Sequence, residues 1–290
     1  MKGTFAIIGC GRAGLAFAKY LTDAGYIPAG FASRSIESAR HAAGITGFEG
    51  PVATTPGDVV GDADIILITT PDSVIRQTAE AVAGHGNIKK GTLAFHCSGA
   101  QSSAELSALE DAGVKTGSIH PLQSFSAGSP LKNPFEGIMI GIEGDRTAVE
   151  TAWRIAQDLG ATPFEIETRG KMIYHASAVV ASNYLVTLMK MAMDLLGASG
   201  VEATERFEVL KPLVMGTLSN IENAGPVDAL TGPIARGDVD TVRAHVAAIG
   251  RDAPQMLALY KTLGRYTVDI ASERNSITED TRQALLAVLS

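Results

Sequence analysis

A glycine-rich turn at the start of the chain constrains the fold more than any other feature. The apolar run at residues 5–8 predicts a buried strand, and apolar residues continue at helical spacing over 15–21. Between them the sequence has the form G-x-G-x-x-G, whose residues expected to contact a ligand are Gly9, Gly11, Arg12, Ala13 and Gly14. In this setting the glycines allow a tight turn, close approach of a pyrophosphate and close helix packing. The free N–H groups at the helix start favour an anion.

Strand-like and helix-like segments alternate over the first part of the chain, which is typical of a parallel α/β sheet. Beyond residue 167 the pattern is helical throughout, and Pro212 is expected to kink or bound one of the helices. We therefore predict a doubly wound, mainly parallel Rossmann sheet at 1–166, followed by an all-α domain at 167–290. The strands are expected at 4–8, 27–32, 52–53, 64–70, 93–97, 114–119, 138–142 and 163–166.

Composition excludes several classes of partner. The chain has 290 residues, a formal net charge of -7 and no basic run, so a nucleic-acid partner is not expected. Its only two cysteines, Cys10 and Cys97, lack the spacing of a zinc site or a disulfide framework, which predicts no metal and a reducing cytoplasm. The early first strand leaves no room for a signal peptide.

One uncharged stretch raises the question of a membrane helix. Residues 172–189 lie between Lys171 and Lys190 and carry no formal charge. The stretch also contains histidine, serine, asparagine, tyrosine and threonine, which are costly in lipid. We therefore expect a helix buried in protein on most sides and no membrane partner.

The end of the predicted second strand bears on the choice of cofactor. About 20 residues beyond the glycine turn, NAD-preferring sheets of this type carry an acid, and NADP-preferring ones carry an arginine. The sequence here is Ser33-Arg34-Ser35, and the nearest acid, Glu37, is expected to point away within the next helix. Arg34 pairs well with a phosphate, which favours NADP over NAD. The alternative is a surface arginine without a ligand.

Polar residues gather at three further strand ends, where ligands of open α/β sheets collect. Two of the clusters contain a histidine, His96 and His120, beside small polar residues, which raises the expectation of a site. Each also has a purely structural alternative, such as a capping turn. The expected cofactor contacts are Thr70, Pro71, Ser98 and Gly99, and the expected substrate contacts are His96, Gln123 and Ser124.

The helical half offers a second set of candidates. Lys171 and His175 are four residues apart and share a helix face, where His175 suits proton transfer and Lys171 suits orienting a carbonyl or donating a proton. Asn183 must find polar partners in an apolar run. Thr231 and Arg236 lie in a glycine-containing loop that either closes on substrate or turns a corner between helices.

The strings FAIIGCGRAG, FHCSGA, SIHPLQSF, YHASAVVASNYLVTL and LTGPIARGD resemble those of an uncharacterised family in which a Rossmann-like NADP-binding domain precedes a helical domain of unknown function. The two-domain plan is similar to that of the 6-phosphogluconate dehydrogenase-like superfamily. This resemblance implies NADP-dependent oxidation or reduction and a homodimer formed through the helical domain. Hydroxyacid dehydrogenases of the superfamily place a lysine and, one turn later, an asparagine on the long helix. Here His175 follows Lys171 instead, which leaves an imine substrate open.

Taken together, the residues and the resemblance predict an NADP-dependent oxidoreductase that acts on a small carbonyl/hydroxyl or imine/amine compound. The expected catalytic residues are His175, Lys171, Asn183 and His120. The alternative is a non-catalytic nucleotide sensor, since fold alone does not determine function.

Overall fold

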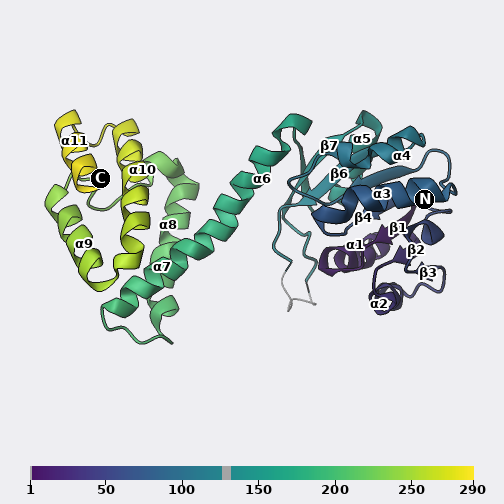
Figure 1. The fold of residues 1–290 in the computed structure, drawn as a ribbon, viewed down its shortest axis with the longest axis horizontal. Coiled ribbons are helices and arrows are strands. Elements are labelled where there is room, and N and C mark those ends of the chain that lie inside the picture. Colours follow the sequence, from purple (N-terminus) through teal and green to yellow (C-terminus); the bar gives the residue numbers. More distant parts are fainter. Residues whose placement is uncertain (1, 126–131) are drawn as a thin grey trace. The chain divides into compact units, whose positions relative to one another are not determined.

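The computed structural model describes residues 2–125 and 132–290, which divide into two compact units. The first ends at Ala181 and contains the sheet, drawn in purple to teal in Figure 1. The second, Ser182–Ser290, is helical and is drawn in green to yellow. The first unit thus continues past the expected boundary at 166, because the helix that follows the last strand begins against the sheet.

The first unit is built on one eight-stranded sheet in the order β3-β2-β1-β4-β5-β6-β7-β8. All neighbouring strands are parallel except β6 and β7, which are antiparallel, so the doubly wound, mainly parallel prediction is confirmed. The strands are β1 Thr4–Ile8, β2 Ile27–Ala32, β3 Val52–Ala53, β4 Ile65–Ile68, β5 Leu93–His96, β6 Lys115–Pro121, β7 Met139–Gly144 and β8 Thr162–Glu165.

Helices cover both faces of this sheet. Strand β4 shows why: Ile65 and Leu67 face one core, while Ile66 and Ile68 face the other, so all four are buried. Burying each such side chain stabilises the folded state by about 1.5–3 kcal/mol relative to leaving it exposed. On one face lie α1 Arg12–Asp23, α2 Ile36–Thr46 and α5 Arg146–Asp158. On the other lie η1 Pro56–Val59, α3 Ile75–His85, η3 Ser103–Leu106 and α4 Ser107–Asp111.

The strand order reverses between β1 and β4, which are neighbours in the sheet although two strands separate them in sequence. At such a reversal the loops leaving the two strands turn toward opposite faces and leave room for a ligand. Here those loops carry Gly9 and Thr69, whose backbones lie close together. This position places the glycine turn at the carboxyl edge of the sheet.

The remaining helices of the chain follow β8. They are η4 Thr168–Gly170, α6 Lys171–Val179, a π-helical segment Val180–Tyr184, α7 Leu185–Ala198, α8 Arg206–Asp228, α9 Val239–Asp252, η6 Pro254–Met256, α10 Leu257–Glu273 and α11 Glu279–Val288. In the second unit α9, α10 and α11 share a small core that includes Val242, Val268 and Leu285. The all-α prediction for the end of the chain is therefore confirmed.

Two expectations about these helices are corrected. Pro212 lies inside α8, and the break in that helix falls instead at Gly225, whose backbone has φ 77° and ψ 165°. The helix predicted from the apolar run at 172–189 is expected to be buried on most sides, yet only 6% of its apolar 18-residue stretch is buried within the chain. Within the described residues, Thr168–Ala198 is one helix that is long and apolar enough to cross a membrane by length and composition.

Candidate functional site

The glycine turn has the geometry that its sequence predicts. Gly9 has φ +103°, and a Cβ on it would lie 2.8 Å from the Thr69 and Thr70 backbone. A Cβ on Gly14 would lie 2.1 Å from the Gly9 carbonyl oxygen, so this position requires glycine for helix packing. A Cβ on Gly11 would meet nothing within 4 Å, and no side chain caps the start of α1. The turn therefore offers free N–H groups beside open space, which fits a pyrophosphate.

A pocket of about 390 Å³ continues from this turn across the ends of β1, β2 and β4. The predicted residues Gly9, Ser33, Arg34 and Thr70 line it together. The Thr70 hydroxyl is buried and has no hydrogen-bond partner among the described residues, as expected for a group that awaits a ligand. Sequence reasoning missed eight further lining residues; Thr54, Pro56, Gln77 and Thr78 are among them and lie on segments that only the fold brings to this edge.

Ser35 serves mainly to start α2. Its Oγ accepts from the Ser38 N–H at 3.4 Å and donates to Glu37 Oε2 at 2.7 Å, which holds the pKa of Glu37 below its usual value. Glu37 lies in the first turn of α2, as expected, and it is not among the residues that line the pocket. Arg34 is exposed and lines the pocket.

His96 holds the loop that follows β5. The Ser98 N–H donates to His96 Nδ1 at 3.1 Å, so Nε2 carries the proton and donates to the Ser102 carbonyl at 3.0 Å. The side chain is fully buried, and burial lowers its pKa, which keeps this tautomer neutral. Both ring nitrogens are committed to backbone partners, so the structure gives His96 a role in shaping the loop and leaves no nitrogen for substrate.

Lys171 fastens the start of α6 to the same loop. Its Nζ donates to the Ser98 carbonyl at 2.8 Å and to Ser118 Oγ at 2.9 Å, and the residue is only 2% exposed. Burial lowers its pKa to about 8, against the opposing effect of the Glu143 carboxylate. Lys171 therefore holds the loop and helix together, and its amine is enclosed by protein.

Glu143 on β7 is a buried carboxylate that sequence reasoning missed. It is 1% exposed and accepts hydrogen bonds from the Ser103 N–H at 2.7 Å, from Ser103 Oγ at 3.1 Å and from Thr168 Oγ1 at 3.0 Å. These bonds connect η3 to the turn before α6. The signal was present in the sequence, since a glutamate directly after an apolar strand run must find partners.

Three aromatic rings meet above this loop. His120 Nδ1 and the Tyr174 hydroxyl are 2.7 Å apart, and the His120 and His175 ring centres are 6.1 Å apart. A Cβ on Gly99 would lie 2.7 Å from both His120 Nε2 and His175 Nδ1, so glycine lets both rings approach the backbone. Burial, followed by the nearby Lys171, lowers the pKa of His120 to about 4, and burial raises the pKa of Tyr174 to about 12. Sequence reasoning named both histidines but missed Tyr174.

Other predicted residues lie elsewhere. Gln123 and Ser124 line a second pocket, of about 540 Å³, with Arg12 beside α1 and α2. Asn183, Thr231 and Arg236 belong to the second unit, where all three are exposed. In the loop that contains Thr231 and Arg236, Asp238 caps the start of α9 by accepting a hydrogen bond from the Thr241 N–H at 3.0 Å. The candidate site that the structure assembles by itself is therefore formed by the first unit.

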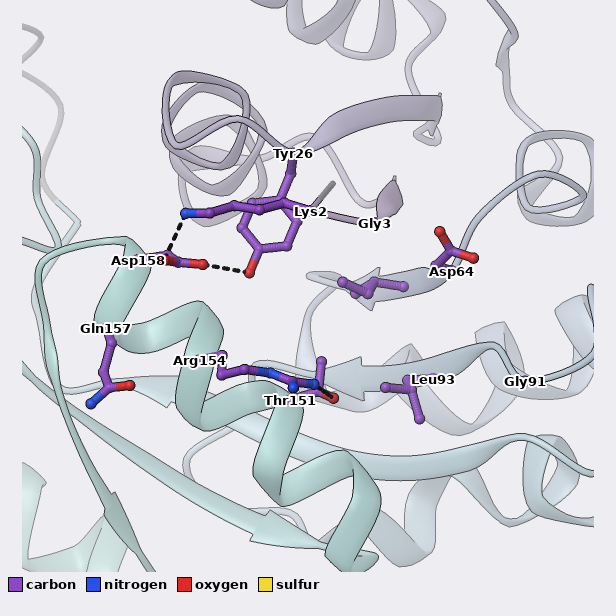
Figure 2. A pocket seen from close by; sticks show the side chains of 11 residues that line it. Lys2, Gly3, Tyr26, Asp64, Gly91, Leu93, Thr151, Arg154, Gln157 and Asp158 are labelled. Atoms are coloured by element: carbon purple, nitrogen blue, oxygen red, sulfur yellow. Dashed lines mark hydrogen bonds and ion pairs between the residues drawn. The ribbon is translucent and has the colours of Figure 1, made fainter.

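A larger pocket of about 590 Å³ lies at the opposite, amino edge of the sheet (Figure 2). Five of its polar residues are paired with one another: Lys2 Nζ lies 2.6 Å from Asp158 Oδ1, Tyr26 donates to Asp158 at 2.8 Å, and Arg154 donates to Thr151 Oγ1 at 2.9 Å. Ligands of doubly wound sheets bind at the carboxyl edge, so we do not assign a site here.

Unpartnered polar atoms distinguish the carboxyl edge. Among the described residues, the buried side-chain nitrogen and oxygen atoms without a partner are Thr70 Oγ1, Gln101 Oε1 and His175 Nδ1. All three belong to segments at the ends of β4 and β5 or to the helix packed on them. Burying such an atom costs about 1–3 kcal/mol, so their concentration at one edge marks it as built to receive a polar ligand.

Fold and site together define a Rossmann-like protein with a dinucleotide-type glycine turn and a cluster of histidine and tyrosine rings. A family model described as "Rossmann-like domain" matches residues 2–121, and one described as "Domain of unknown function (DUF2520)" matches residues 138–267. Together these two matches cover most of the chain, in the order that the sequence resemblance predicts. No curated protein matches the chain.

Solved structures share the fold. A protein from Bacteroides fragilis, provisionally assigned as an NADP oxidoreductase, is 23% identical with a TM-score of 0.73 over 92% of this chain and 98% of its own. A protein from Thermotoga maritima is 25% identical with a TM-score of 0.73, and the match covers 93% of this chain and 99% of that protein. A reductive aminase from Aspergillus terreus, in complex with NADPH and ethyl levulinate, is 16% identical with a TM-score of 0.64 over 96% and 100%.

Proposed function

We propose that this protein is an NADP-dependent oxidoreductase that acts on a small carbonyl or imine compound. The observation that carries the proposal is the carboxyl edge of the sheet, where a nucleotide-type glycine turn and unpartnered polar atoms lie beside a histidine–tyrosine cluster. A nucleotide sensor would need the turn but not the rings. The NADP- and NADPH-binding proteins among its structural relatives support the same class.

The chain's own residues suit each part of the cofactor. The turn residues Gly9, Gly11, Arg12, Ala13 and Gly14 would hold the pyrophosphate on the start of α1. Ser33 and Arg34 would meet the 2′-phosphate, since both line the pocket that begins at the turn. Thr70, Pro71, Ser98 and Gly99 would flank the nicotinamide half. Bound NADPH supplies the hydride, and the protein supplies position and a proton.

His120 and His175, which both lie beside Gly99, are the candidates for donating the proton. We assign Lys171 a positioning role, because its amine holds the Ser98 carbonyl on which the loop depends. Asn183 is proposed to orient the substrate. Gln123, Ser124, Thr231 and Arg236 complete the proposed substrate contacts.

The cofactor part of the proposal is tested by titrating the protein with NADPH and NADH and following nicotinamide fluorescence. We expect tighter binding of NADPH, and we expect Arg34→Ala to reduce the difference by about 10- to 100-fold, the value of charge-assisted bonds to a phosphate. Arg40→Ala, in the second turn of α2 and also exposed, serves as the matched control. Equal affinities of the wild type for the two nucleotides would rule out the preference.

The catalytic part is tested with a panel of carbonyl and imine compounds, following NADPH absorbance. Turnover that falls about 100-fold or more in His120→Ala or His175→Ala supports the assignment. A wild type that binds NADPH but reduces no compound in a broad panel favours the sensor instead.

We further propose that two copies of the chain associate through the helical unit. Large apolar side chains are exposed along α7 and α8 of the second unit: Leu185, Val186, Leu188, Phe207, Val209, Leu213, Met215, Leu218 and Ile221. An exposed apolar surface of this kind marks an interface, and the family resemblance implies a homodimer. A membrane surface is the alternative occupant.

Sedimentation equilibrium distinguishes these occupants. We expect a dimer in the absence of detergent, converted to monomer by Val186→Asp with Leu213→Asp, which are both 69% exposed. Tyr266→Asp, an equally exposed position on α10, is the control and should leave the dimer intact. A wild-type monomer that co-sediments with lipid vesicles would contradict the dimer.

A further inference from the structure

The Tyr174–His120 pair has an orientation that the proposed function does not use. Tyr174 Oη lies 2.7 Å from His120 Nδ1, and the two rings meet edge to face at 86°. The donor of this hydrogen bond depends on the His120 tautomer, and the relay proposed below requires the tautomer in which the Tyr174 hydroxyl donates to Nδ1. A neutral imidazole that accepts at Nδ1 carries its own proton on Nε2.

The Nε2 side of the His120 ring lies against the loop that follows β5. A Cβ on Gly99 would lie 2.7 Å from His120 Nε2, so this nitrogen borders the loop that follows β5. The charged and titratable groups that act on the ring are Lys171 and His175 on α6, Asp72 in the short helix η2 Asp72–Val74, and His96 on β5. Burial keeps the ring neutral and keeps the tyrosine protonated, because the pKa of His120 falls to about 4 and that of Tyr174 rises to about 12.

We propose that Tyr174 is the proton source of the reaction, that His120 relays its proton from Nε2 to a substrate oxygen, and that the substrate is therefore a ketone or aldehyde. This inference rests on the proposed NADP-dependent reduction. It adds a catalytic residue and selects the carbonyl class over the imine class.

The step balances in atoms and charge. The carbonyl carbon gains the hydride that NADPH supplies, and the C=O π pair becomes an alkoxide lone pair on oxygen. That oxygen takes the Nε2 proton of His120, while Nδ1 takes the hydroxyl proton of Tyr174. A tyrosinate remains, and solvent reprotonates it. An alkoxide is a stronger base than a phenolate, so the transfer is downhill.

Imine reduction makes a different demand. It proceeds from an iminium cation, so the proton must be added before the hydride, by an acid that ionises near neutral pH. Neither member of this pair is such an acid, since one is a weakly acidic phenol and the other a neutral imidazole. An imine would need its proton from His175, the other histidine at Gly99, and not from this pair. Lys171, whose pKa is nearer neutrality, is enclosed and bonded to Ser98 and Ser118.

The chain contains a matched control. In the second unit Tyr260 Oη lies 2.8 Å from His245 Nδ1, with ring centres 6.1 Å apart and an interplanar angle of 83°. Tyr260→Phe removes the same type of bond as Tyr174→Phe, and neither substitution removes a ring. An effect specific to Tyr174→Phe therefore reports the relay and not the loss of any tyrosine–histidine bond.

The first measurement needs no substrate. Ring nitrogens of ¹⁵N-histidine protein are recorded by NMR, with His120→Asn used to assign the His120 signals. We expect the Nε2–H tautomer for His120 in the wild type and in Tyr260→Phe, and a tautomer mixture in Tyr174→Phe. An Nδ1–H tautomer in the wild type overturns the relay whether or not the protein reduces any compound.

The second measurement compares cyclohexanone with 2,3,4,5-tetrahydropyridine, a six-membered ketone and a six-membered imine. We expect the wild type to reduce the ketone, and Tyr174→Phe to lower that kcat about 100-fold or more while Tyr260→Phe leaves it unchanged. Reduction of the imine alone, or a Tyr174→Phe rate equal to wild type, overturns the proposal. If the wild type reduces neither compound nor any member of the broad panel, the oxidoreductase assignment fails, while the tautomer still tests the Tyr174–His120 hydrogen bond.

Discussion

The two edges of the sheet differ in how their polar side chains are partnered. At the amino edge, Lys2 and Tyr26 both bind Asp158 (Figure 2). Asp64 pairs with Lys89 and accepts a hydrogen bond from the Thr4 N–H at the start of β1. At the carboxyl edge, buried polar atoms of Thr70, Gln101 and His175 have no partner among the described residues. Among the described residues, the buried side-chain atoms without a partner therefore concentrate at the carboxyl edge and not at the amino edge.

The connections of the sheet explain the difference. In a parallel sheet each helix begins near the carboxyl end of the preceding strand, so its free N–H groups and positive dipole end lie at that edge. Helix α1 begins directly after β1 at Gly11, without a side-chain cap. Polar atoms that are left unpaired at this edge lower the free energy of unfolding. Hydrogen bonds to the anionic and amide groups of a bound ligand would raise it again.

The largest effect is expected from the turn that opens the carboxyl edge. Gly14→Ala places a Cβ against the Gly9 carbonyl oxygen and should lower the free energy of unfolding by about 3 kcal/mol. Gly11→Ala meets no neighbour, so it should keep wild-type stability while weakening NADPH binding at least about 10-fold. Urea unfolding and fluorescence titration measure the two effects. Loss of stability in Gly11→Ala with unchanged NADPH binding would contradict this division.

An effect of similar size is expected from acid. The pKa of His120 is about 4 in the folded protein, against an ordinary value of 6.5, so between these pH values only the unfolded chain binds the proton. Stability is therefore full above pH 6.5 and falls as the pH approaches 4, by about 3 kcal/mol from this residue. Burial also lowers the pKa of His96, so its protonation in the unfolded chain adds to the loss of stability. His120→Asn should flatten the slope of unfolding free energy against pH, and a slope equal to wild type would show that His120 is not held neutral.

The smallest effect is expected at the amino edge. Tyr26→Phe removes the hydrogen bond to Asp158 and should cost about 1 kcal/mol of stability. NADPH affinity should not change, because no residue of the glycine turn contacts this pocket. Thermal unfolding and nucleotide titration of one preparation give both values. A large loss of NADPH affinity would show that the two edges are coupled.

Much of the fold follows from local pattern. The run at residues 64–70 predicts a strand because Ile65 to Ile68 are apolar on both faces, as burial between two helix layers demands. Helix burial was less predictable. The run at 172–189 is apolar enough for a core helix, but apolar character does not say whether the covering surface comes from the same chain.

The site was predictable only in part, for a similar reason. His96 and His120 both end strands beside small polar residues and look alike in sequence. In the structure His96 is enclosed by the loop of Ser98 and Ser102, while His120 meets Tyr174. Tyr174 lies between Lys171 and His175, yet its contact with a strand more than fifty residues earlier is not visible in local spacing.

The sequence by itself determined the dinucleotide-type turn, the alternation of strands and helices, and the arginine after the second strand. These are set by short-range sterics and by side-chain periodicity, which neighbouring residues encode. Only the tertiary structure decided which polar groups are satisfied. It buried Lys171 and Glu143 as supports, turned His96 inward, and paired His120 with Tyr174. Burial and hydrogen bonding arise where distant segments pack together, and these contacts distinguish a residue that supports the site from one that acts in it.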